Sequence, residues 1–183
     1  AGDPTFNNFK TLQAWKYGGI IQVARELIED SGVDLQGFLA DQIGVGLGGS
    51  INAALTNGTG TTQPFGLATT AGSGVTGGTG ISGAFTADNI IDLVYSLDTV
   101  ARRAPGAGFQ MSRQAIANAR KLKDGYGSYL FEPSLSADKM DLLLGYSIYE
   151  NPDLAAPATG AKSVLFGDLQ SYMVREVGGI RLD

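Results

Sequence analysis

The chain has 183 residues, enough for one substantial domain, with no cysteine, no histidine and a formal net charge of −5. The two missing residue types exclude disulfides, thiol nucleophiles, the usual zinc sites and the commonest general base. The acidic balance should repel a phosphate backbone, and no apolar run approaches the roughly eighteen residues of a membrane span, so we expect no membrane contact.

The first expected element is an extended stretch over residues 6–23. Phe9, Trp15 and Tyr17 fall on one face of a strand there, because successive strand side chains alternate. Such a strand is either an ordinary edge strand or an arm that packs on a neighbouring subunit. Phe6, Phe9 and Trp15 are therefore candidate arm anchors, and packing within the chain is an equally good interpretation.

Residues 34–56 predict a long amphipathic helix. Its apolar side chains recur at a spacing of four, at Leu35, Leu39, Ile43, Leu47, Ile51 and Leu55. Asp34 suits the N-cap or the first turn of this helix. The four glycines between positions 44 and 49 each cost about 1 kcal/mol relative to alanine in a helix interior, so the helix needs tertiary support.

Residues 56–83 are rich in threonine and glycine, which is typical of loop or weak strand. We place a boundary between two lobes in this segment. The second lobe begins with a helix that Thr86 opens and that the loop at 104–108 ends. The buried stripe of this helix is expected to comprise Ile90, Leu93, Val94, Leu97 and Ala101.

The rest of the second lobe alternates short strands, turns and one further helix. Ser112 is expected to cap that helix, which runs to about Leu122. We expect strands at 109–111, 129–131, 142–149, 162–166 and 172–177, and turns at 124–127 and 167–168. The pattern indicates a compact lobe of mixed helices and strands.

Two segments, residues 44–49 and 72–77, match the dinucleotide-binding pattern Gly-x-Gly-x-x-Gly. That chemistry requires a turn between a strand and a helix, with an acidic residue about twenty positions on. The first match lies inside the apolar helix pattern and the second opens no immediate helix, so we interpret both as chance. With no P-loop and no Gly-x-Ser-x-Gly motif, we expect no catalytic residue, no cofactor and no metal.

Five short segments stand in order along nearly the whole chain. They are residues 17–31, residues 55–60 with 63–66, residues 121–131, residues 143–146, and residues 166–168 with Tyr172. Together they resemble the major capsid family of tailed bacteriophages. Residues 17–31 are similar to the family's strand leading into Ser-Arg-Glu-Leu-Leu-Glu-Asp-Ser, with Ala24 in place of the usual serine. Residues 121–131 resemble its Leu-Lys-Asp-x-x-Gly-Arg-Tyr-Leu-Phe.

The resemblance implies an α+β fold of the tailed-phage major capsid (Johnson) type, incomplete in this chain. Residues 1–23 would be the returning strand of an extended arm. Residues 24–83 would be part of the peripheral domain, with its spine helix at 34–56. Residues 84–175 would form the axial domain, and residues 176–183 would return toward the peripheral domain.

The resemblance also implies a structural capsid subunit with no enzymatic activity. Copies of it would form pentamers and hexamers that close into an icosahedral head around double-stranded DNA, with other head proteins and without sequence-specific DNA contacts. Assembly would occur in the bacterial cytoplasm, and the product would be the virion. Asp124 and Tyr126, within the third of these motifs, join Phe6, Phe9 and Trp15 as candidate interface residues.

Two alternatives stay open at this point. One is an encapsulin-like shell of a bacterial compartment, which shares the fold and would enclose a cargo enzyme. The other is a nucleotide-binding α/β enzyme built on the glycines at 44–49.

Overall fold

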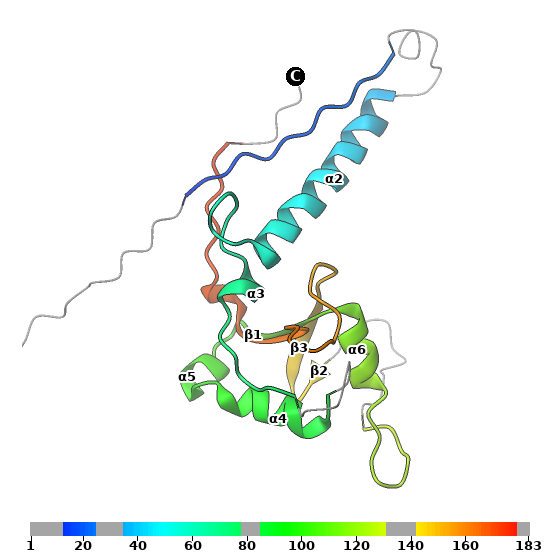
Figure 1. Cartoon of the computed structure of the whole chain (residues 1–183), viewed down its shortest axis with the longest axis vertical. Helices are drawn as coiled ribbons and strands as arrows, with labels where there is room; N and C mark the ends of the chain where they lie inside the picture. The colour runs from blue at the N-terminus through cyan, green and yellow to red at the C-terminus, as the bar shows by residue number, and fades with distance from the viewer. Residues whose placement is uncertain (1–12, 25–34, 78–84, 131–141, 179–183) are drawn as a thin grey trace, which may run out of the picture.

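A computed structural model describes residues 13–24, 35–77, 85–130 and 142–178 of the chain (Figure 1). The helices are α2 (Leu35–Asn57), α3 (Leu67–Thr70), α4 (Ala87–Ser96), α5 (Thr99–Arg102) and α6 (Arg113–Arg120). The strands are β1 (Ala107–Met111), β2 (Leu142–Leu143), β3 (Tyr146–Glu150) and β4 (Val164–Asp168), followed by the 3-10 helix η1 (Leu169–Ser171). Figure 1 shows α2 projecting away from the sheet, with α4, α5 and α6 gathered around the strands. The predicted α+β class is confirmed.

The four strands form one mixed sheet in the order β2-β3-β1-β4. β1 pairs in parallel with β3 and antiparallel with β4, while β2 and β3 are antiparallel neighbours. The connection from β1 to β3 includes α6, because parallel neighbours need a crossover. The predicted strand at 109–111 is confirmed, although it begins earlier, at Ala107.

The core lies on one face of this sheet. Phe109 and Met111 of β1 are completely buried, at 0% exposure, because alternate strand residues point to the same face. The other buried members of the cluster are Ile90, Val94 and Ala115. The Phe166 ring lies 4.7 Å from Phe109 and 4.9 Å from Tyr146, so three strands contribute to one aromatic cluster.

Local capping explains where the helices around the core begin. The Thr86 side chain accepts from the Asn89 amide, and the Asn89 side chain accepts from the Thr86 amide, which forms a capping box before α4. The Ser112 hydroxyl accepts from the Ala115 amide at the start of α6. Both predicted helix starts are confirmed, and α6 ends at Arg120, a little before the predicted end.

The predicted continuation of α4 to Ala101 is wrong. The helix ends at Ser96, and Leu97 adopts an extended backbone with ψ of 142°. The Ser96 hydroxyl donates to the Leu93 carbonyl and so competes with the main-chain bonds of the last turn. After Asp98 a separate helix, α5, continues to Arg102.

The apolar run at 142–149 is two strands, not the single strand that we predicted. β2 and β3 are joined by a two-residue turn at Leu144 and Gly145, with φ of 52° and 85°. Two successive positive φ values are the signature of a type I′ hairpin turn, whose twist matches that of the flanking strands. Leucine is unusual at such a position, because its Cβ crowds the backbone there.

Two further predictions at the end of the described chain are wrong. Gly167 and Asp168 are not a turn: they belong to β4 and pair with Gly108 and Ala107. Residues 172–177 form no strand, because the chain leaves the sheet through η1. The predicted strand at 129–131 is represented by a single bridge between Tyr129 and Lys123, and Phe131 lies outside the described residues.

The predicted long helix is confirmed as α2, but most of it is open to solvent. The six apolar side chains spaced by four are all half-buried, and among the α2 side chains whose burial the structure describes only Ala54 and Thr56 are fully buried. Phe38 and Val45 are 58% and 74% exposed. Asp34 lies outside the described residues. Of the described helices, none is long and apolar enough to cross a membrane.

Residues 13–24 follow an extended path that belongs to no strand (Figure 1). Trp15 and Tyr17 are half-buried while Lys16 between them is exposed, as the alternating pattern predicts. The expected sheet pairing of this segment is not present among the described residues.

Candidate subunit-interface surfaces

The described residues hold no group of three or more acidic side chains that could bind a metal ion. The glycines at 44–49 lie in the middle of α2, where none meets another atom within 4 Å of its Cβ position. A dinucleotide site needs these glycines at a strand-to-helix turn, so this geometry contradicts the nucleotide-binding alternative.

A buried polar joint connects the end of α2 to the sheet. Asn151, which follows β3 and is 3% exposed, donates from its side chain to Thr56 Oγ1 at 2.8 Å and accepts from Asn52 at 3.1 Å. Its main-chain amide donates to the Met111 carbonyl at 2.9 Å. Asn52 also donates to the Asp153 carboxylate. One buried amide side chain thus ties the helix, the loop after β3 and the central strand together.

The last turn of α2 has a second attachment through Tyr172. The Tyr172 hydroxyl donates to the Phe65 carbonyl at 2.7 Å and lies 3.4 Å from the Leu55 carbonyl. Burial, and after it the nearby Tyr17 hydroxyl, raises the pKa of Tyr172 above its ordinary value. The extended segment that carries Tyr17 therefore passes close to the end of α2.

The loop that follows α6 projects from the sheet region and is closed by its own hydrogen bonds (Figure 1). Asp124 Oδ1 accepts from the amides of Tyr126 at 2.9 Å and Ser128 at 2.8 Å. The Lys123 ammonium lies 4.8 Å from the centre of the Tyr129 ring. The predicted turn is confirmed, and Tyr126 at its tip is 98% exposed.

The candidate interface residues therefore differ in their position and exposure in the structure. Phe6 and Phe9 lie outside the described residues. Trp15 is half-buried in the extended segment. The Asp124 carboxylate accepts a hydrogen bond from the Tyr126 amide of its own loop, and the side chain that the loop exposes is that of Tyr126. The structure brings Asp124 and Tyr126 together and leaves Trp15 on a different part of the molecule.

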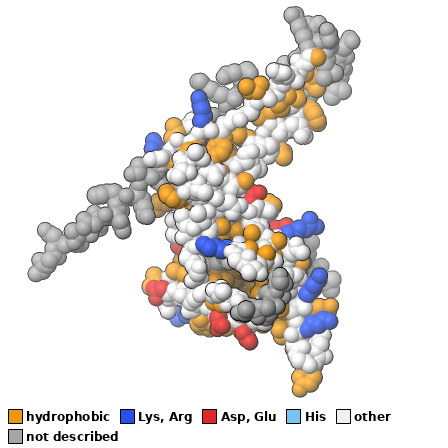
Figure 2. Space-filling model, viewed as in Figure 1, with side chains coloured by type: hydrophobic (Ala, Val, Ile, Leu, Met, Phe, Trp, Pro, Cys, Tyr) orange, Lys and Arg blue, Asp and Glu red, His pale blue; other side chains and the backbone are white. Residues whose placement is uncertain are grey.

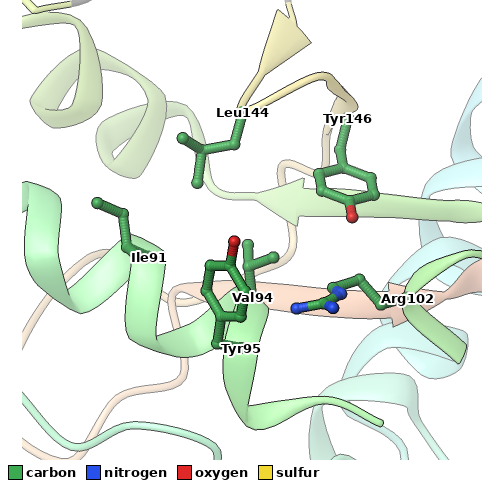
Figure 3. Close-up of a pocket in the computed structure, with 6 residues that line it drawn as sticks. All are labelled: Ile91, Val94, Tyr95, Arg102, Leu144 and Tyr146. Atoms are coloured by element: carbon green, nitrogen blue, oxygen red, sulfur yellow. The ribbon is translucent and has the colours of Figure 1, made fainter. Parts of the chain in front are cut away.

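An open cavity of about 320 Å³ lies between α4, α5 and the β2–β3 hairpin (Figure 3). Its lining residues are Ile91, Val94, Tyr95, Arg102, Leu144 and Tyr146. Figure 3 shows Leu144 on the hairpin facing Ile91 and Tyr95 on α4, with Arg102 beside the Tyr95 ring. The Arg102 guanidinium lies 4.6 Å from the centre of that ring, so the cavity combines apolar walls with one cation.

Sequence reasoning missed this cavity because it assigned only one apolar face to α4. Ile91 and Tyr95, at 40% and 69% exposure, form a second apolar face beside the buried Ile90 and Val94. Their spacing of four could have indicated it. Leu144 could not have been found in this way, because the turn that presents it was not recognised.

Charged side chains divide between the two sides of the sheet region (Figure 2). α4 carries Asp88 and Asp92 and no basic residue. α6 carries Arg113 and Arg120 and no acidic residue, and the loop after it adds lysines. Arg102 and Arg120 occupy the last turns of α5 and α6, where a cation suits the helix dipole.

The sequence matches the model of the phage capsid family over residues 2–183. Two solved structures, described as the capsid of an empty and of a native GTA particle computed with C5 symmetry, are each 31% identical to the chain, with TM-scores of 0.66 and 0.65. Each alignment covers 79% of this chain and 53% or 52% of the capsid chain. No curated protein matches at a significant level.

The chain therefore belongs to the phage capsid family, and the predicted capsid fold is confirmed. The family and the matching solved structures are of capsid proteins, which are structural and not enzymatic. The chain spans about half the length of the solved capsid chains that it matches.

Proposed function

We propose that this chain is part of a major capsid subunit that assembles through pentameric and hexameric rings into an icosahedral head enclosing double-stranded DNA. The observation that carries the proposal is the incomplete burial of α2 in a chain of the phage capsid family. A long helix with so little buried surface needs a partner, and in a shell that partner is another copy of the subunit.

The helix itself supports this argument. Four glycines in its middle weaken it by about 1 kcal/mol each relative to alanine, so packing has to compensate. Within the chain, fully buried side chains occur only at its C-terminal end, at Ala54 and Thr56. Phe38 and Val45, further toward the N-terminus, expose most of their apolar surface. We infer that a neighbouring subunit covers this part of α2.

The contacts between subunits would be heterologous, with different patches of the same chain meeting across each interface. Durable shells need roughly 2,000 Å² or more of buried area for each obligate interface. Phe6, Phe9 and Trp15 would anchor an arm on one neighbour, and Asp124 would hold Tyr126 in place for another. Aromatic side chains suit this role because they bury large areas at low entropic cost.

The net charge of −5 supports a container for DNA that does not bind it tightly. The packaged DNA would be held without sequence-specific contacts, and other head proteins would complete the particle after assembly in the bacterial cytoplasm. An encapsulin-like compartment remains the competing proposal, since it shares the fold, and the contents of the shell distinguish the two.

The test is to express the full-length polypeptide that contains residues 1–183 and to examine it by negative-stain microscopy and sedimentation velocity. We expect shells or capsomer rings, and protein that stays monomeric under all assembly conditions would overturn the proposal. Nuclease-protected double-stranded DNA in particles from a complete phage would support a phage head. An enzyme as the sole cargo would support the compartment instead.

A pair of variants on α2 tests the role of its exposed face. Val45→Asp places a charge on the proposed contact and should reduce the yield of shells sharply. The far-UV circular dichroism spectrum of the free subunit should not change. Ser50→Asp adds the same charge at an exposed site of α2 that is five positions further on and therefore on a different face, and it is the matched control. Equal shell yields for the two variants would contradict a subunit contact at Val45.

A further inference from the structure

The sheet region carries both an exposed tyrosine and an open cavity. Tyr126 stands at the tip of a short loop, and 98% of its surface is exposed. The loop is pre-ordered, because Asp124 binds two of its amides and the Leu130 amide donates to the Leu122 carbonyl at 2.9 Å. A rigid aromatic side chain of this kind loses little entropy on binding.

The cavity beside α4 has the chemistry to accept such a ring. Its volume of about 320 Å³ lies at the lower end of the range for small-ligand pockets. Ile91, Val94 and Leu144 supply apolar walls, while Arg102 and Tyr95 supply a cation and a ring. Aromatic anchors that fill a pocket on the partner are the usual centres of protein interfaces.

The charges around the two features are opposite. The end of α6 and its loop carry Arg120, Lys121 and Lys123. The cavity is lined by α4, which carries Asp88 and Asp92. Asp98 adds a third carboxylate before α5, and Arg102 in the cavity wall and Arg103 after α5 are basic exceptions on this side. Figure 2 shows several basic side chains over α6 and its loop and several acidic ones over α4 and α5, with Glu150 beside Arg113 and Arg120 as an acidic exception. Such complementarity steers two patches together and sets their register.

The occupant of the cavity is a second copy of this chain. The loop projects from α6, at the opposite end of the sheet region from α5 (Figure 1). A patch on one side that fits a patch on the other side gives a head-to-tail contact, and repeated head-to-tail contacts close into a ring.

We propose that Tyr126 of one subunit inserts into the cavity formed by α4, α5 and the β2–β3 hairpin of its neighbour, with Lys121 and Lys123 facing Asp88 and Asp92. This contact rests on the proposed function, and it specifies which two surfaces of the sheet region meet within a ring.

Cysteine cross-linking tests the contact directly, because residues 1–183 contain no cysteine. In the full-length protein, with any other cysteine replaced by serine, Tyr126→Cys combined with Ile91→Cys should give a ladder of disulfide-linked oligomers in assembled shells. The same protein kept unassembled should give none. Tyr126→Cys combined with Met173→Cys, an exposed site away from the cavity, is the control pair and should give no ladder.

Truncation of the tyrosine measures its energetic contribution. Tyr126→Ala should weaken subunit association by about thirtyfold, the effect of removing one interface hot spot. Tyr126→Phe keeps the ring and should assemble much like the wild type. Because the side chain is almost fully exposed in the subunit, neither substitution should alter the unfolding midpoint of the free protein.

Charge reversal tests the pairing of the two sides. Lys123→Glu and Asp92→Lys should each slow assembly at low salt, and the double variant should recover much of the lost rate, because each reversed charge meets an opposite one across the contact. Failure of the double variant to recover, together with absence of the disulfide ladder, would overturn this inference.

The outcomes separate the two proposals. A wild-type protein that forms neither rings nor shells contradicts the proposed function itself. Normal shells combined with no cross-link through the cavity, and normal assembly of Tyr126→Ala, contradict only the contact described here.

Discussion

The sheet region and α2 are stabilised in different ways. The sheet region has its own apolar core, in which Phe109 and Met111 are completely buried between α4, α6 and the strands. α2 buries fully only Ala54 and Thr56, near its C-terminal end, where Asn151 joins it to the loop after β3. The difference shows that one part of the chain is folded by hydrophobic burial, whereas the other is positioned by a few directional hydrogen bonds.

This contrast suits a subunit that has to fit into a lattice. An apolar core tolerates little change in volume and keeps the sheet region rigid. A polar joint sets the direction of the helix through bond geometry, while it leaves the surface of the helix available to neighbours. The following predictions test the contrast on the free full-length protein.

The largest effect is expected in the apolar core. Phe109→Ala removes a completely buried ring that contacts Phe166 and Tyr146, and it should lower the free energy of unfolding by about 3–5 kcal/mol. Urea denaturation followed by circular dichroism measures the loss. Val100→Ala, at a site that is 79% exposed, should change stability by less than about 0.5 kcal/mol. Equal effects would show that the core is not where the stability resides.

The polar joint should come next. Asn151→Ala removes the buried partner of Thr56 and one of the two acceptors of Asn52, and it should cost about 1–3 kcal/mol. Amide exchange should accelerate in the last turn of α2 and much less in α4. Asn57→Ala removes one exposed bond, to the Asp153 carbonyl, and should cost less. Unchanged exchange in α2 would contradict the role of Asn151 as a joint.

The hairpin turn offers a stabilising change in the sheet region. Leu144→Asn puts a residue that tolerates positive φ at the first turn position, and it should raise the free energy of unfolding by about 1 kcal/mol. Leu142→Asn changes a similarly exposed leucine within β2, where the backbone is ordinary, and should give no gain. A loss at both sites would argue against turn strain.

The glycines of α2 offer a matched change in the other region. Gly44→Ala adds a methyl group that meets nothing within 4 Å, and it should stabilise the free protein by about 0.5–1 kcal/mol. At Gly58, just after the helix, a Cβ would overlap the carbonyl oxygens of Pro64 and Ala54, so Gly58→Ala should destabilise. Differential scanning calorimetry of the two variants compares the signs. A loss for Gly44→Ala would show that this part of α2 is already packed.

The smallest effect is a pH dependence. The pKa of Tyr172 is raised in the folded state, so its contribution to stability is complete below the unfolded value of about 10 and is lost as pH rises through the folded value. Denaturation measured from about pH 9 to about pH 11 should therefore show an alkaline loss that Tyr172→Phe reduces. Tyr126→Phe, at the exposed loop tip, should leave that loss in place.

Local signals in the sequence were sufficient for several elements. Thr86 and Ser112 cap helices through bonds to residues three positions away, so their neighbours alone determine where α4 and α6 begin. Alternation in β1 placed Phe109 and Met111 on one face. The segments resembling the phage capsid family, taken in order, led to the correct fold.

Other features depend on residues that are distant in sequence. Asn151 meets Thr56 and Asn52 only after the chain has folded, and nothing around any of the three indicates the others. The turn at Leu144 was hidden because a continuous apolar run predicts one strand, and only the pairing of β2 with β3 forces a leucine into positive φ. The cavity beside α4 depends on that same turn.

The sequence by itself therefore determined the class of the fold, the starts of α4 and α6, the position of the short strand at 109–111 and the family, because each follows from short-range chemistry or from ordered motifs. The tertiary structure alone decided how α2 is attached, which apolar side chains stay exposed, and where an open cavity faces an acidic helix. These depend on contacts between segments that only the folded backbone brings together.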